Sequence, residues 1–159
     1  MVGSSQAHII RVSPVVDTGI YADGEVMFQA CELPAAVFQQ GRAAQLVSVS
    51  GLSLADISPG FDLVFTQDSV NLGTVNGALA VTDADLQAAG VLGRFSVVTG
   101  DYTDLGNMRE FSCSMSGRQV MLEAREQATS IWLAAVVRGS TPTFGAATAL
   151  ELALGVKYW

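Results

Sequence analysis

Positive charge is scarce in this sequence. Lys157 is the only lysine, the arginines are scattered, and the formal net charge is −7. Only 14% of the residues are charged, against about 25% in an average soluble domain. Binding to nucleic acid or to an anionic membrane surface requires clustered cations. The sequence therefore predicts no nucleic-acid partner and no membrane partner, and its low charge favours apolar contact with another protein.

Residues that carry catalysis or hold metals are equally rare. His8 is the only histidine, and Cys31 and Cys113 are far apart with no CxxC motif. A zinc site needs three or four such ligands at suitable spacing, and neither phosphate-binding glycine motif occurs. The segment SCSMSG, residues 112–117, lacks the glycine that a nucleophile elbow needs at Ser114. We therefore predict a protein that is not an enzyme and has no cofactor or metal, with two buried thiols; a disulfide is the alternative.

Long apolar runs are also missing. None approaches the roughly 20 residues that span a bilayer. The first sixteen residues, MVGSSQAHIIRVSPVV, lack the charged start and the apolar block of a signal peptide. We expect synthesis and folding in a cytosol.

Short runs that alternate between apolar and polar residues dominate what is present, and they are typical of β-strands. The segment from Ser130 to Val137 is apolar at nearly every position, which favours a central strand covered on both faces. Three other segments place their apolar residues on one face: Phe61, Leu63 and Phe65; Val120, Leu122 and Ala124; Leu150, Leu152, Leu154 and Val156.

Turn and helix signals divide these strands. Val47 and Val49 share a parity that Leu52 and Leu54 do not, which predicts a β-bulge near Gly51. Asn76-Gly77 predicts a tight hairpin. Thr82, two acids and Gly90 delimit one short helix near residues 83–89.

These elements predict the fold class. Many short strands and a single helix indicate an all-β, single-domain antiparallel β-sandwich, jelly-roll-like in its topology. Residues 1–16 would form an N-terminal arm and first strand, and residues 17–159 the sandwich domain.

The acidic stretch DTGIYADGEVM, residues 17–27, admits two interpretations. Its carboxylates suggest calcium, but Gly19 and Tyr21 stand where an EF-hand loop needs ligands. Asp23-Gly24 is a common pair for a hairpin turn, and Asp17 before Thr18-Gly19 is typical of a turn capped by its own side chain. Turns account for every residue of the stretch, although a calcium site assembled from separate loops remains open.

Four segments resemble a family of small virion proteins of tailed bacteriophages, encoded close to the major capsid protein. They are DTGIYADGEVM, FDLVFTQDSVNLGTVN, FSVVTGDYTDLGN and VVRGSTPTFGAATALELALGVKYW. Residues 1–16 lie outside the resemblance. It implies a capsid decoration or cement protein, made in the bacterial host cytoplasm and bound to the capsid surface of the virion. Its partners would be the major capsid protein and itself, as a homotrimer by analogy with other decoration proteins.

The candidate interface residues lie near the two ends of the chain. They are His8, Ile9, Ile10, Tyr158 and Trp159. We expect residues 1–8 to be an arm that is ordered only against a partner. Trp159 would be either an interface anchor or a ring over the rim of its own sandwich. The alternative function is a ligand- or receptor-binding β-sandwich module of a phage tail or fibre. Such a module needs exposed aromatic rings, whereas Trp132, in an apolar strand, is predicted to be in the core.

Overall fold

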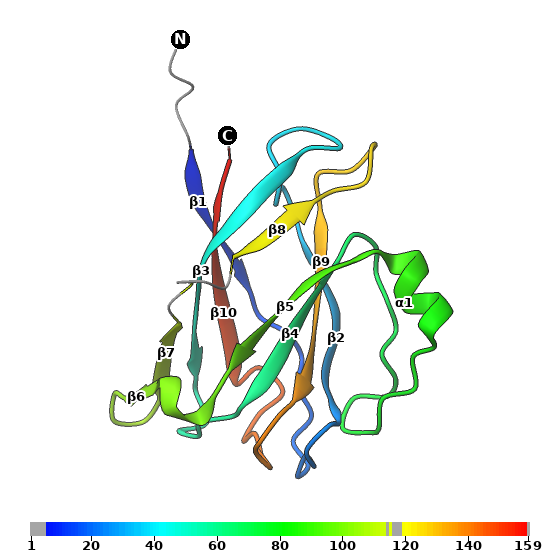
Figure 1. The fold of residues 1–159 in the computed structure, drawn as a ribbon. Helices are drawn as coiled ribbons and strands as arrows, with labels where there is room; N and C mark the ends of the chain where they lie inside the picture. The colour runs from blue at the N-terminus through cyan, green and yellow to red at the C-terminus, as the bar shows by residue number, and fades with distance from the viewer. Residues whose placement is uncertain (1–5, 114, 116–118, 159) are drawn as a thin grey trace.

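The computed structural model describes residues 6–113, 115 and 119–158, and these form two antiparallel β-sheets that pack face to face (Figure 1). The first sheet has the order β1-β10-β3-β7-β6, with β8 also paired to β3, and the second has the order β2-β9-β4-β5. The strands are β1 (Ala7–Val12), β2 (Val26–Leu33), β3 (Ala43–Ser53), β4 (Phe61–Thr66), β5 (Val91–Val97), β6 (Tyr102–Asp104), β7 (Arg109–Cys113), β8 (Val120–Glu123), β9 (Ile131–Val137) and β10 (Leu150–Lys157); the helices are α1 (Asp83–Ala89) and a 3-10 turn (Thr99–Asp101).

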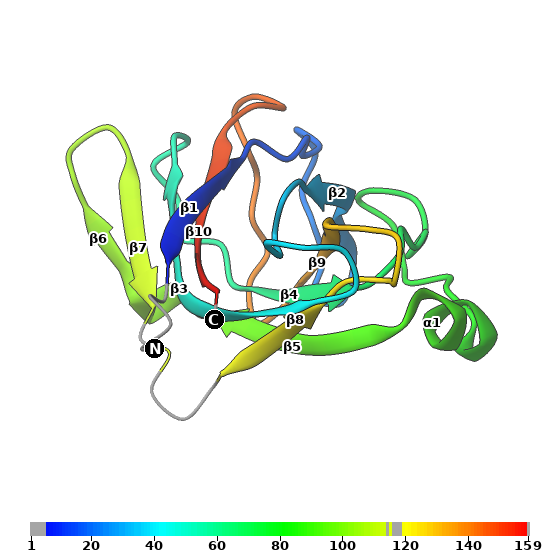
Figure 2. The same cartoon turned by 90° about the horizontal axis from the view of Figure 1, so that it is seen from above.

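The strand pairs are nested. β1 pairs with β10, β2 with β9, β3 with β8, and β4 with β5. Nested antiparallel pairs shared between two sheets are the arrangement of a jelly roll. Seen from above, α1 stands outside the second sheet and the β6–β7 hairpin projects on the opposite side (Figure 2). The predicted β-sandwich with jelly-roll-like topology is confirmed.

The core between the sheets is formed by the apolar faces that the alternation predicted. The inward residues of β4, β8 and β10 are buried, as are those at alternate positions of β9. β9 is apolar on both faces because Ala134 and Val136 point outward into a second cluster with Val70, Leu72 and Ala89. Trp132 shares this outer face but lies in neither cluster and is only half-buried, so its prediction as a core residue was wrong.

The predicted helix is confirmed with its caps. The Thr82 hydroxyl accepts a hydrogen bond from the Asp85 N–H at 3.2 Å. Gly90 ends the helix in the left-handed region at φ 68°, and its N–H donates to the Gln87 carbonyl. Both caps satisfy backbone groups that a helix of this length leaves unpaired.

The bulge in β3 lies four residues before its predicted position. The register between β3 and β10 shifts where Leu46 pairs with Val156 and Ser48 with Gly155, which leaves Val47 unpaired. Val47 is therefore 38% exposed while Val49 is buried. Pairing continues through Gly51 without a shift in register. The ring of Phe111 packs against the inner side of Gly51, where a side chain would otherwise lie.

The two predicted hairpins are turns that do not join paired strands. Asn76 has φ 58°, and its flanking segments share a hydrogen bond from the Ala80 N–H to the Leu72 carbonyl at 2.8 Å, but their β-bridges are to Glu25 and Val26. Gly24 has φ 88° while Asp23 has no positive φ, which fits a type II turn before β2 rather than a type I′ hairpin. The turn positions were correct and the strand pairing was wrong.

Gly24→Val should lower the free energy of unfolding by about 1 kcal/mol, because a β-branched residue is strained at positive φ. An added Cβ would meet nothing closer than the Arg138 guanidinium at 3.5 Å, so the cost comes from the backbone alone. Urea denaturation measures it, with Gly100→Val as the control, because Gly100 has no positive φ and open space around it. Equal losses in the two variants would contradict the assignment of strain to Gly24.

Candidate interface around the chain termini

The first and last strands lie side by side in the first sheet. Their register runs from Ala7 opposite Lys157 to Val12 opposite Leu152. Figure 1 shows the start of β1 and the end of β10 at the same end of the molecule. His8, Ile9, Ile10 and Tyr158 are thus brought together, although β1 and β10 are separated by nearly the whole sequence.

The alternation of β1 divides the candidate residues. Ile10 is buried in the core, whereas Ile9 is 59% exposed on the outer face of the sheet. Ala7 and His8 belong to β1, so the predicted free arm of residues 1–8 was wrong at these two positions. Residues 1–5 and Trp159 lie outside the described residues, and the expectations for them stay predictions.

His8 and Tyr158 contact each other and the backbone of the same chain. The Tyr158 hydroxyl donates to the Ala35 carbonyl at 2.6 Å. Its oxygen lies 3.1 Å from His8 Nε2. Because a hydroxyl has a single proton to donate, a hydrogen bond between these two groups requires Nε2 of His8 to be the donor. Burial raises the pKa of the Tyr158 phenol, so the group stays neutral.

The middle of the outer face of β1, β10 and β3 is formed mostly by small residues, with Lys157 in the neighbouring row on one side and Glu151 in the neighbouring row on the other. One row across the strands is Ile9, Gly155 and Ser48, and the next is Arg11, Ala153 and Ser50. We call these six residues the terminal face. Arg11 is its only charged member and has no ion pair among the described residues. Docking this face on another protein would desolvate little charge, which lowers the free-energy cost of binding.

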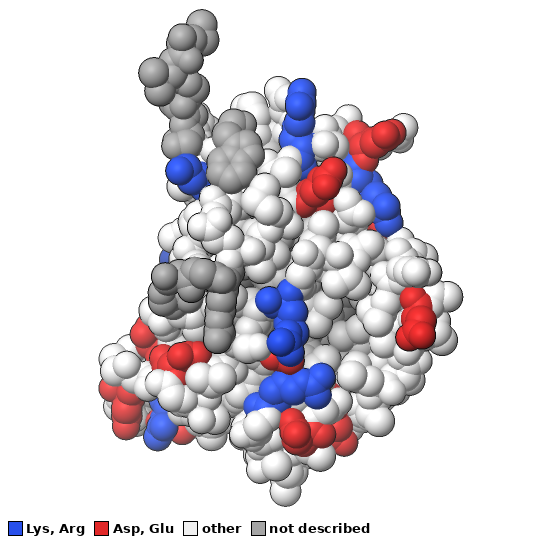
Figure 3. Space-filling model, viewed as in Figure 1, with Lys and Arg blue, Asp and Glu red and all other residues white. Residues whose placement is uncertain are grey.

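Charge is sparse on the side of the molecule that Figure 1 faces. In the space-filling view the charged side chains lie in small groups with broad uncharged areas between them (Figure 3). The predicted shortage of surface charge is therefore visible on the folded molecule.

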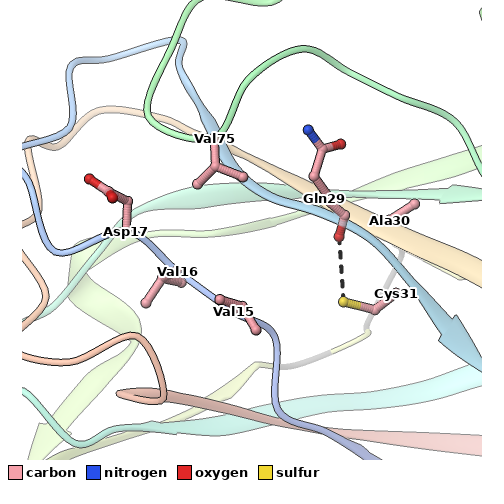
Figure 4. Close-up of a pocket in the computed structure, with 7 residues that line it drawn as sticks. All are labelled: Val15, Val16, Asp17, Gln29, Ala30, Cys31 and Val75. Carbon is pink, nitrogen blue, oxygen red and sulfur yellow. Dashed lines mark hydrogen bonds between the residues drawn. The ribbon is translucent and has the colours of Figure 1, made fainter.

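A shallow apolar pocket of about 460 Å³ lies between the β1–β2 connection and β2 (Figure 4). Val15, Val16, Ala30 and Val75 provide most of its lining, and Cys31 lies at its edge. The Cys31 thiol donates to the Gln29 carbonyl at 3.4 Å, and burial raises its pKa. The group is therefore a protonated thiol and a poor nucleophile. The pocket can accept a small apolar group.

Both cysteines are half-buried thiols. Cys31 lies in the second sheet and Cys113 in the first. The sulfur of Cys113 is 3.6 Å from Asp101 Oδ2, to which it donates. The predicted thiols are confirmed, though half-buried rather than buried.

The acidic stretch before β2 uses its carboxylates to cap the backbone. Asp17 Oδ2 accepts from the Gly19 N–H at 2.8 Å and from the Asn76 amide at 2.7 Å, and these bonds hold the pKa of Asp17 below its ordinary value. Asp23 accepts from the Gly139 N–H and Glu25 from the Ala22 N–H. Asp17 and Glu25 thus cap turns within the stretch, as predicted, whereas Asp23 caps the backbone that follows β9.

The described residues also bear on metal binding and on membrane crossing. No group of three His, Cys, Asp or Glu side chains within residues 6–113, 115 and 119–158 is arranged to hold a metal. Ser114 and residues 116–118, which include half of the SCSMSG segment, lie outside the described residues. In the same part of the chain, every helix is too short or too polar to cross a membrane.

Sequence reasoning missed one buried polar cluster. Asp62, 3% exposed, accepts from Arg94, Arg138 and Ser96. These residues lie in β4, in β5 and directly after β9, so no local sequence motif predicts the cluster. It is a structural ion cluster in the second sheet, and its consequences for stability are large.

Comparisons with known proteins identify no family. No family model matches the chain, and no curated protein matches it. The resemblance to tailed-phage virion proteins therefore stays a prediction.

Among solved structures the chain shows weak likeness to viral chains and to a carbohydrate-active one. A chain of Desmodium yellow mottle tymovirus is 12% identical, with 99% of this chain and 82% of that chain covered, at a TM-score of 0.30. A chain of turnip yellow mosaic virus is 13% identical, with 97% and 93% covered, at 0.29. A Clostridium thermocellum xylanase 10B chain with CBM22-1 and GH10 modules, complexed with xylohexaose, is 12% identical, with 95% and 24% covered, at 0.33. Likeness at this level carries no argument about function.

Proposed function

We propose that this protein is a capsid decoration or cement protein, a non-enzymatic structural component of a virion. It would bind the outer surface of a tailed-phage head and stabilise it. Its partners would be the major capsid protein and further copies of itself, as a homotrimer by analogy, with synthesis in the host cytoplasm before assembly. The four phage-like segments of the sequence support this proposal.

The observation that carries the proposal is the terminal face. Ile9 is exposed on a patch of mostly small residues in which Arg11 is the one charged side chain. A rigid patch with a single charge can be buried against a capsomer at low desolvation cost, and burial of one isoleucine contributes about 2 kcal/mol. The nested jelly roll beneath the face keeps its shape fixed when it docks.

Ile9→Asp should weaken binding to capsids by about tenfold or more, because it places a charge in the centre of the buried contact. Purified heads that lack the protein are mixed with each variant and sedimented, and the bound fraction is measured. The variant should keep the melting temperature of the wild type, since Ile9 makes no core contact.

Val91→Asp is the matched control. Val91 is 51% exposed at the start of β5, in the other sheet. Binding by this variant should equal that of the wild type. If Ile9→Asp binds as well as Val91→Asp, the terminal face does not contact the capsid.

A second candidate function is a ligand- or receptor-binding module of a phage tail or fibre. One observation favours it: Phe38 is 66% exposed beside Tyr158, which provides the accessible aromatic surface that such a module needs. Antibody labelling of virions separates the two functions. Many copies over the shell support decoration, and a few copies at the tail support the module.

A further inference from the structure

A pocket of about 500 Å³ lies at the end of the sandwich beside the chain termini, on the side of the 39–42 turn. Phe38 and Tyr158 line it together with three polar side chains: Gln39, Arg42 and Glu123. This volume is within the usual range for small-molecule sites, which combine aromatic walls with a few placed polar groups.

Two aromatic rings form a continuous apolar wall. Their centroids are 5.8 Å apart and their planes are inclined by 52°. The Tyr158 ring is fixed in place because its hydroxyl is bonded to Ala35 and His8. Phe38, by contrast, is 66% exposed, although burying a phenyl ring is strongly favourable. The exposed Phe38 ring and the fixed Tyr158 ring together offer an aromatic surface on which a ligand can stack.

The polar groups stand on a backbone that is already ordered. The Arg42 N–H donates to the Gln39 carbonyl, and the Gly41 N–H donates to the Arg125 carbonyl at 3.2 Å. Gly41 has φ 65°, and an added Cβ would lie 3.1 Å from the Glu126 backbone. Glu123 is held by its pairing in β8 with Ala43. The backbone that carries these exposed side chains is thus in place before any ligand arrives, which lowers part of the entropic cost of binding.

The hydrogen-bonding capacity of the three polar side chains is unused. Among the described residues, none of them has a side-chain hydrogen bond, and Arg42 and Glu123 have no ion pair. The guanidinium donates, the carboxylate accepts, and the amide does both. Their charges cancel, so the pocket favours a ligand that is neutral and carries groups that both donate and accept.

We propose that this pocket binds a neutral oligosaccharide. The apolar C–H face of a sugar ring would stack on Phe38 and Tyr158, and its hydroxyls would bond to Glu123, Arg42 and Gln39. A phosphate-bearing ligand would need an excess of cations, which the pocket and the chain, with its net charge of −7, do not supply. The site does not depend on whether the protein sits on a phage head or a tail.

The test is an NMR titration of the whole chain with three neutral probes: maltohexaose, cellohexaose and N-acetylchitohexaose. At least one should cause saturable shifts in the backbone amides of residues 38–43 and 121–124. Phe38→Ala should weaken that binding by about tenfold, the loss expected for one stacking ring. Glu123→Gln should weaken it by a similar factor, because the amide accepts fewer hydroxyl hydrogen bonds.

Val98→Ala is the control, since Val98 is an exposed apolar residue at the end of β5. It should bind as the wild type does, and the spectra of all variants report whether they are folded. Absence of shifts with all three sugars at about 10 mM, where a dissociation constant of a few millimolar is still detected, would overturn the proposal. So would shifts that survive in both Phe38→Ala and Glu123→Gln, or binding of ADP at this pocket in place of the sugars.

Discussion

Gly51→Ala is expected to lower the free energy of unfolding by about 3 kcal/mol, the range seen when a well-packed core must accept an extra group against backbone. Gly51 faces the interior in the middle of β3, between β10 and β7. An added Cβ would collide with the Glu151 carbonyl and would lie 2.6 Å from the Phe111 ring. Phe111 cannot retreat, because its ring is fully buried against Phe61 and Tyr102.

Gly145→Ala is the matched control for this prediction. Gly145 has no positive φ, and a Cβ there would meet nothing within 4 Å. Urea unfolding followed by tryptophan fluorescence gives both values, and Gly145→Ala should differ from the wild type by about 0.5 kcal/mol or less. A Gly51→Ala variant as stable as Gly145→Ala would show that β3 and β10 can separate at this point at no cost.

The strands and the helix could be predicted because their signals are local. Leu150, Leu152, Leu154 and Val156 all point inward, and Thr82 caps α1. Periodicity and capping depend on residues within a few positions of each other, so the sequence displays them directly.

The bulge and the hairpins could not be placed because strand pairing is not local. Val47 and Val49 look alike in the sequence, and only the register with β10 shows which of them leaves the ladder. The bulge was predicted at Gly51 because a glycine within a strand often marks one. In the structure Gly51 instead makes room for the ring of Phe111. A glycine that permits close packing and a glycine that permits a bulge give the same sequence signal.

The candidate interface was predicted in part. The two ends of the chain were identified, but their meeting depends on the pairing of β1 with β10. The sequence HIIRV, residues 8–12, has two adjacent isoleucines, and only the pairing with β10 shows which of them faces the core. Phe38 was missed because it lies in a connection without periodicity, where exposure follows from the fold alone.

Asp62→Asn is expected to lower the free energy of unfolding by about 2 kcal/mol, the cost of weakening hydrogen bonds between charged groups at one buried carboxylate. The cost stays below that of a fully buried ion pair because the Arg94 and Arg138 side chains are 65% and 46% exposed, so water can hydrate them in the variant. Asp62 accepts from Arg94 and Arg138 at 3.0 Å each and from Ser96 at 2.6 Å. Asparagine has the same size, so no cavity forms, but the two guanidinium groups lose their shared counter-charge. The control is Asp68→Asn, because Asp68 pairs with Arg125 in an exposed bridge that contributes less than about 1 kcal/mol.

The loss caused by Asp62→Asn should depend on pH, and the direction follows from the pKa of Asp62. Burial alone would raise this pKa, but the hydrogen bonds from Ser96 and Arg138 and the charge of Arg94 outweigh burial and hold it below 3.8. The unfolded chain therefore takes up a proton at a higher pH than the folded chain does. The contribution of Asp62 is fully present above about pH 5 and is lost as the pH falls through the folded pKa. Urea unfolding of both proteins at several pH values should show the difference between wild type and Asp62→Asn shrinking below about pH 4. A difference that stays constant down to about pH 2 would mean that the charge of Asp62 does not stabilise the second sheet.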